Sequence, residues 1–167
     1  MLTLEAWDHD AQALDSVSEM STKRLKIKAD DTTQSILVVE DVHETRDGIE
    51  KLLLADGYRV AVARDERDAI DSAQRQCPDL ILVSLAGLPR EVILAARRIR
   101  ECAETGEQVP VVVFCIGEIG EGDEVAVGQN VHVTRPDNFN QLRSLLARLL
   151  SKIPVCSLRS NKEFHEY

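Results

Sequence analysis

The sequence predicts a doubly wound α/β domain, in which helices cover both faces of a parallel β-sheet. Two observations carry this prediction. Five short segments with the composition of strands lie between residues 35 and 134, and segments with helical spacing alternate with them. Most of the strand segments are apolar along their whole length, which is typical of parallel strands buried on both faces.

The expected elements follow one another at regular intervals. Strands are expected at SILVVE (35–40), YRVAVA (58–63), LILV (80–83), VPVVVFC (109–115) and NVHVT (130–134). Helices are expected at 43–57, 66–76, 90–104 and 138–153. Gly57 is placed to end the first helix and Pro78 to stop the second. The last helix carries a continuous stripe of leucines, which indicates that it packs on the sheet.

The chain divides into one domain and two flanking segments. Residues 35–153 form the predicted domain, residues 1–34 an N-terminal extension and linker, and residues 154–167 a C-terminal tail. In the extension, apolar residues recur with helical spacing at Leu4, Trp7, Ala11, Leu14 and Val17. This stripe predicts a short amphipathic helix that docks on the domain or on a second chain, and a mobile tail is the open alternative.

The composition argues against several classes of function. A net charge of −9 is the opposite of what nucleic-acid binding requires. No apolar run is long enough to cross a bilayer and the acidic N-terminus is unlike a signal peptide, so we expect a cytoplasmic protein. The four cysteines show no CxxC spacing, which indicates free thiols rather than a disulfide framework or a zinc site.

In a doubly wound sheet, the ligand site lies at the carboxyl ends of the strands. The polar residues at or just past those ends are Glu40, Asp41, Ser84, Cys115 and Arg135. Glu40 and Asp41 are adjacent carboxylates, which suit Mg²⁺, although such a pair alone more often forms a solvated loop.

Four segments together resemble the receiver domain of two-component response regulators. They are ILVVEDV (36–42), PDLILVS (78–84), PVVVFC (110–115) and VHVTRP (131–136). The resemblance covers roughly residues 35–153 and implies a flavodoxin-like fold with five parallel strands in the order 2-1-3-4-5.

The resemblance also assigns roles to single residues. Glu40 and Asp41 match the acidic pair that binds metal, and Ser84 falls where the family has its phosphate-accepting aspartate. The other matched positions are Cys115 for a hydroxyl residue, His132 for a switching aromatic, Arg135 for the invariant lysine, and Pro136, which is retained.

The departures from the family pattern predict that the chain has lost the family's phosphorylation chemistry. Ser84 cannot form an acyl phosphate, and a serine hydroxyl is a weak nucleophile without a base beside it. We therefore expect a pseudo-receiver that is not phosphorylated, needs no cofactor and binds Mg²⁺ at most weakly through Glu40 and Asp41. Phosphorylation of Ser84 itself remains open, whereas Asp79 is discounted because it precedes the strand. The glycine-rich stretch between Cys115 and Arg135 predicts that the family's fourth helix is short or frayed.

The expected function is a stand-alone, receiver-like signalling module of the two-component (phosphorelay) type. It is expected to be no enzyme and to act by contact with a protein, either a histidine kinase or another signalling protein, and a homodimer is left open. Neither nucleic acid nor membrane is an expected partner. The alternative is a metal- or small-ligand-binding domain, or one with residual phosphoryl transfer, that uses the same site. Arg135 is expected to pair with Glu40 and Asp41 in place of a metal.

Overall fold

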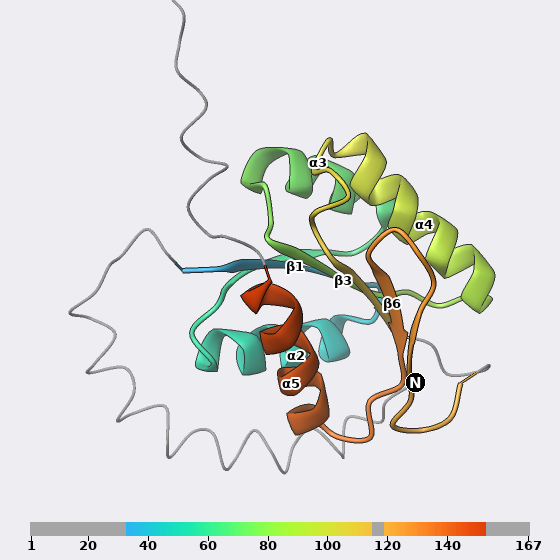
Figure 1. The fold of residues 1–167 in the computed structure, drawn as a ribbon. Coiled ribbons are helices and arrows are strands. Elements are labelled where there is room, and N and C mark those ends of the chain that lie inside the picture. Colours follow the sequence, from blue (N-terminus) through green and yellow to red (C-terminus); the bar gives the residue numbers. More distant parts are fainter. Residues whose placement is uncertain (1–32, 115–118, 153–167) are drawn as a thin grey trace, which may run out of the picture.

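A six-stranded sheet forms the centre of the domain in the computed structural model, which describes residues 33–114 and 119–152 (Figure 1). The strands are β1 (Ser35–Glu40), β2 (Arg59–Ala63), β3 (Leu80–Ser84), β4 (Val111–Phe114), β5 (Glu124–Ala126) and β6 (Val131–Thr134). The helices are α2 (His43–Ala55), α3 (Glu66–Gln76), α4 (Pro89–Cys102) and α5 (Phe139–Ser151). The predicted N-terminal stripe, Cys115 and the C-terminal tail lie outside the described residues.

The order of the strands is β2-β1-β3-β4-β6-β5, and all neighbours except the last pair are parallel. The predicted α/β class and the order of the five predicted parallel strands are confirmed, and β5 is a sixth, antiparallel strand that was not predicted. Helices cover both faces, with α3 and α4 on one side and α2 and α5 on the other (Figure 1). No helix among the described residues is long and apolar enough to cross a membrane.

The prediction of a short or frayed helix before the last parallel strand is wrong for residues 119–130. These residues contain β5, which pairs antiparallel with β6 at the edge of the sheet. The reason lies in the local sequence, because EVAV (124–127) alternates as a strand does and GQN (128–130) supplies the turn. Gly128, Gln129 and Asn130 all have positive φ, and the Val127 N–H donates to the Val131 carbonyl at 2.9 Å.

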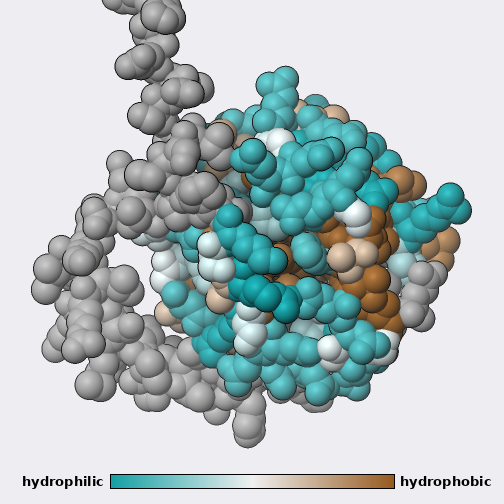
Figure 2. All heavy atoms as spheres, in the orientation of Figure 1, coloured by the Kyte–Doolittle hydropathy of each residue, from teal (hydrophilic) through white to brown (hydrophobic). Residues whose placement is uncertain are grey.

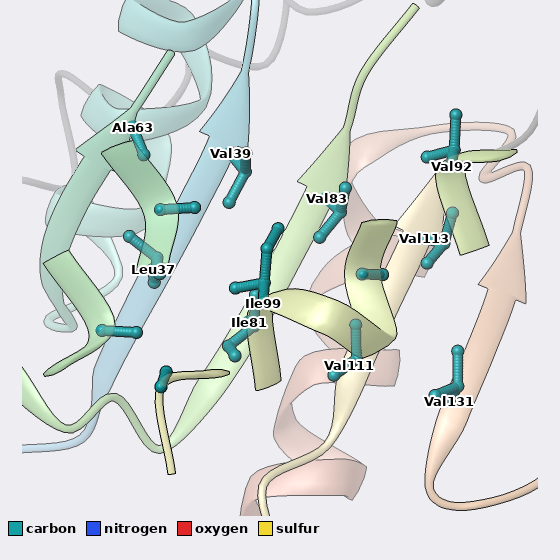
Figure 3. Packing of buried hydrophobic residues seen from close by; sticks show 14 of the residues in the cluster. Leu37, Val39, Ala63, Ile81, Val83, Val92, Ile99, Val111, Val113 and Val131 are labelled. Atoms are coloured by element: carbon teal, nitrogen blue, oxygen red, sulfur yellow. The ribbon is translucent and has the colours of Figure 1, made fainter. Parts of the chain in front are cut away.

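Two apolar layers hold the helices against the sheet. Alternate residues of each strand face opposite layers. Leu37 and Val39 of β1 face α3 and α4, whereas Ile36 and Val38 face α2 and α5. Figure 3 shows the first layer, where valines from neighbouring strands pack against Ile99 and Val92 of α4. Because both faces of β1, β3 and β4 are covered, their positions are fixed by burial as well as by hydrogen bonds.

Two adjacent leucines of α2 provide a test of this packing. We predict that Leu53→Ala, at a position that is 0% exposed, lowers the free energy of unfolding by about 2–5 kcal/mol. Leu54→Ala, at a position that is 50% exposed, should change it by less than about 0.5 kcal/mol. Urea denaturation followed by far-ultraviolet circular dichroism measures both, and equal effects would contradict the assigned orientation of α2.

Candidate functional site

The carboxyl ends of β1 and β3 meet in the middle of the sheet. The two strands are parallel neighbours, and their register places Glu40 directly opposite Ser84. Both residues are the last of their strands, so two loops leave the sheet at this point. We call Glu40, Asp41 and Ser84 the strand-end site.

Glu40 is almost fully buried, with 3% of its surface exposed. Its Oε1 accepts a hydrogen bond from the Val42 backbone N–H at 2.9 Å, and its side chain is hydrogen-bonded to that of Ser84. Arg46 lies close by, but its guanidinium donates to the Glu40 backbone carbonyl at 2.9 Å. None of the ion pairs among the described residues neutralises the Glu40 carboxylate.

Burial is the main cause that raises the pKa of Glu40 above its ordinary value of 4.5. The hydrogen bonds from Ser84 and Val42 favour the charged form and oppose this rise, while the Asp41 carboxyl, which is within hydrogen-bonding reach, adds to it. The Glu40 carboxyl group therefore retains its proton to a higher pH than an ordinary glutamate does.

Asp41 connects the two loops of the site. Its side chain is exposed, and its Oδ2 accepts a hydrogen bond from the Ala86 backbone N–H at 3.3 Å. The loop after β1 is thereby joined to the loop after β3. Sequence reasoning missed Ala86, since a backbone N–H carries no residue signature.

The donor set of the strand-end site is two carboxyl groups and one hydroxyl. Mg²⁺ demands octahedral oxygen coordination and favours charged carboxylates. Within residues 33–114 and 119–152, no group of three or more His, Cys, Asp or Glu side chains could hold a metal ion. Burial also opposes the charge on Glu40, which makes this carboxyl group a poorer ligand for a divalent cation.

The chain after β6 does not place Arg135 as expected. Arg135 is half-buried, and its backbone is fixed by the hairpin, because its N–H donates to the Asp123 carbonyl at 3.2 Å. In the part of the chain that the structure describes, no ion pair joins Arg135 to Glu40 or Asp41. The expected ion pair of Arg135 with these carboxylates is therefore not formed in the described residues. Pro136 follows and is buried.

His132 belongs to the β5–β6 hairpin rather than to the strand-end site. It pairs with Val112 of β4, so it faces the layer that α5 covers. Its Nδ1 lies 3.7 Å from Glu124 Oε1, and Glu124 also pairs with Arg148 of α5. Burial lowers the pKa of His132, and the Glu124 carboxylate opposes that change. Sequence reasoning missed Glu124 and Arg148 because their contact depends on the unexpected strand.

Asp79 lies away from the site, as predicted. It precedes β3, at the amino end of the strand, and its Oδ2 accepts hydrogen bonds from the Ser35 backbone N–H at 2.8 Å and from the Ser35 hydroxyl at 3.3 Å. The strand-end site is at the opposite ends of β1 and β3. Asp79 is thus not available to replace the carboxylate that Ser84 lacks.

Comparisons with known proteins point to one family. No protein-family model matches the sequence. The aerobic respiration control protein ArcA of Escherichia coli K12 is 26% identical over 142 residues, which cover 81% of this chain and 58% of ArcA. The chain therefore spans little more than half the length of that curated relative.

Solved structures extend the similarity to isolated receiver domains. The receiver domain of the sensor histidine kinase PA1611 from Pseudomonas aeruginosa PAO1, with a magnesium ion coordinated in its active-site cleft, is 30% identical. That match has a TM-score of 0.54 and covers 71% of this chain and 98% of the domain. A receiver domain of a signal transduction histidine kinase from Syntrophus aciditrophicus is 20% identical, with a TM-score of 0.58, and the match covers 81% of this chain and all of that domain.

The raised pKa of Glu40 leads to a pH-dependent prediction. Below pH 4.5 the Glu40 carboxyl group is protonated in both the folded and the unfolded protein. As the pH rises through the folded-state pKa, Glu40 becomes charged inside the fold, and the free energy of unfolding falls. We predict that Glu40→Gln raises the free energy of unfolding near pH 7.5 by roughly 1 kcal/mol, because it removes a buried charge and keeps an acceptor for Val42. Near pH 4 the gain should vanish. Urea denaturation at both pH values measures the difference.

Glu121→Gln is the matched control, because Glu121 is exposed in a loop. It removes the same charge and should leave the stability at both pH values close to wild type. A Glu40→Gln protein less stable than wild type near pH 7.5 would show that the carboxylate is stabilised in the fold, which contradicts the assigned direction.

Proposed function

Because the chain belongs to the receiver-domain family of two-component signalling, we propose that it is a signalling module that acts by protein contact without phosphorylation at its strand-end site. The observation that carries this proposal is Ser84, paired in register with Glu40 at the end of β3. A receiver accepts a phosphoryl group on a carboxylate, and this position offers a hydroxyl instead. We propose no catalytic role for the site.

The surroundings of Ser84 support the proposal. Phosphoryl transfer to a receiver uses Mg²⁺ to offset the negative charges that meet at the acceptor. Here one carboxylate is missing, and burial opposes the charge on a second, Glu40. The PA1611 receiver domain has magnesium in its active-site cleft. We propose that this chain differs from it by binding Mg²⁺ weakly or not at all, and that it needs no other cofactor.

The proposed partner is a histidine kinase or another signalling protein of a two-component system. The similar structures support this choice, because they include receiver domains of histidine kinases. A homodimer is the second candidate for the contact. Neither partner requires the aspartate that Ser84 replaces, because protein contact depends on surface shape and charge rather than on phosphate.

The first prediction is that acetyl phosphate with Mg²⁺ leaves the mass of the protein unchanged. The reason is the serine in the acceptor position, which forms no acyl phosphate. Intact-mass spectrometry tests this. A phosphoryl adduct that hydroxylamine removes would place an acyl phosphate on a carboxylate of this chain, and a hydroxylamine-stable adduct on Ser84 would reveal serine phosphorylation; either outcome contradicts the proposal.

The second prediction restores the missing carboxylate. Ser84→Asp should lower the free energy of unfolding by roughly 1 kcal/mol without metal, because a third carboxylate then lies beside Glu40 and Asp41. Millimolar Mg²⁺ should return most of that loss. Ser84→Asn, which has the same shape without the charge, and the wild type should respond little to Mg²⁺. Thermal unfolding with and without the metal measures all three proteins.

A wild type that gains as much stability from Mg²⁺ as Ser84→Asp does would overturn this reading. The strand-end site would then be a functional metal site, and the alternative of a metal- or ligand-binding domain would be favoured.

A further inference from the structure

Among the residues that the structure describes, no helix covers the β5 edge of the sheet on the face that α4 covers elsewhere. Val125 of β5 pairs with Val133 of β6, and Val133 belongs to the apolar layer beneath α4. Residues paired directly across a sheet point to the same face, so Val125 also points to this side. Val133 is buried, but Val125 is 43% exposed. The apolar layer therefore continues onto β5 without being fully covered.

The cause is the unusual connection between β4 and β6. Parallel strands are ordinarily joined by a crossover helix, which covers the face of the sheet that it crosses. Among the described residues of this connection, 119–130, there is a strand and no helix. β2, at the other edge, contacts both α2 and α3, whereas β5 packs chiefly against β6.

Apolar side chains gather at this uncovered place. Ile119 and Val127 pack, partly buried, against the same layer as Val133. The Arg97 guanidinium of α4 donates to the Val127 carbonyl at 2.9 Å, which fixes this side of α4 to the hairpin. Leu94, one turn before Arg97, is 44% exposed.

Figure 2 shows hydrophobic surface where the β5–β6 hairpin lies in the orientation of Figure 1. We call Leu94, Ile119, Val125 and Val127 the β5 patch.

We propose that the N-terminal segment of this chain, residues 4–17, forms a helix that docks on the β5 patch and covers it as a crossover helix would. The segment has the required apolar face, because Leu4, Trp7, Ala11, Leu14 and Val17 recur at helical spacing. An amphipathic helix of this length is marginal by itself and gains its stability from packing.

Charge on the α4 side of the patch favours this pairing. The first 20 residues contain five acidic side chains, Glu5, Asp8, Asp10, Asp15 and Glu19, and no Lys or Arg. On α4, Arg90 is exposed and Arg97 is half-buried, and neither takes part in an ion pair among the described residues. The Arg97 guanidinium, which contacts Val127 of the patch, fits an acidic amphipathic helix better than a neutral or basic one.

The linker is long enough for docking within one molecule. Sixteen residue steps separate Val17 from Thr33, which begins the described domain, and an extended chain spans about 50 Å over that length. Four strand spacings separate β1 from β5, or about 19 Å. The segment can therefore reach the patch even if the linker runs around the end of the sheet.

Trp7 is the only tryptophan of the chain, so its fluorescence reports on docking directly. In the full-length protein, we expect Trp7 to be shielded from acrylamide. Val125→Asp should raise its quenching constant severalfold, because a charge is placed in the patch. Val62→Asp is the matched control, since Val62 is 37% exposed on β2 at the opposite edge of the sheet, and it should leave Trp7 shielded.

A second pair of variants tests the patch independently in case Val125→Asp perturbs the hairpin. Leu94→Asp on α4 should expose Trp7, whereas Leu54→Asp, at a similarly exposed position of α2, should not. Leu14→Asp, in the segment itself, should also expose Trp7 without changing the far-ultraviolet signal of the sheet.

Three results would overturn the proposal. In the first, Trp7 of the wild type is quenched as readily as a free indole, which shows an undocked tail. In the second, the shielding persists in both Leu94→Asp and Val125→Asp, which shows docking elsewhere. In the third, the shielding is lost on dilution together with a change in oligomeric state, which shows that the segment docks on a second copy instead.

Discussion

The parallel pairing of β1 with β3 is the interaction on which the rest of the structure depends. These strands lie at the centre of the sheet, and both of their faces are buried beneath helices. A slip of one residue would turn every side chain of a strand to the opposite face, so burial enforces a single register. That register sets Glu40 opposite Ser84 and thereby determines which side chains share the strand-end site.

The register buries the side chain of Glu40, and this burial lowers the stability of the fold when the carboxyl group is charged. A carboxyl group that is 3% exposed and takes part in no ion pair among the described residues is unfavourable in its charged form. The hydrogen bonds from Val42 and Ser84 offset part of the penalty. A glutamine would satisfy the same contacts without the charge. The acid at this position is thus not explained by a contribution to stability.

Much of the fold could be predicted from the sequence because its signals are local. Continuous apolar runs such as LILV identify buried strands, and the strand ends identify Glu40, Asp41 and Ser84 as neighbours. The strand β5 could not be predicted in the same way, because its EVAV alternation is short and a helix is the usual connection between parallel strands.

The parts of the site that escaped prediction depend on non-local geometry. The Ala86 N–H reaches Asp41 only because two loops meet, which no residue pattern shows. Arg135 was expected beside the carboxylates from its place in the chain, yet the hairpin determines the course of its backbone. The contacts of Glu124 with His132 and Arg148 follow from the same hairpin.

The short length of β5 has a consequence for how the protein behaves in a crowded solution. An edge strand exposes backbone N–H and C=O groups that can recruit a strand of another molecule and start aggregation. β5 has only three residues and is flanked by acid, with Glu121 and Asp123 before it and Glu124 within it. Two copies that approached edge to edge would bring these carboxylates together, and the repulsion would keep the sheets apart. These acidic residues thus keep the edge of β5 from pairing with a strand of another molecule, a protection that would weaken in acid or at high ionic strength.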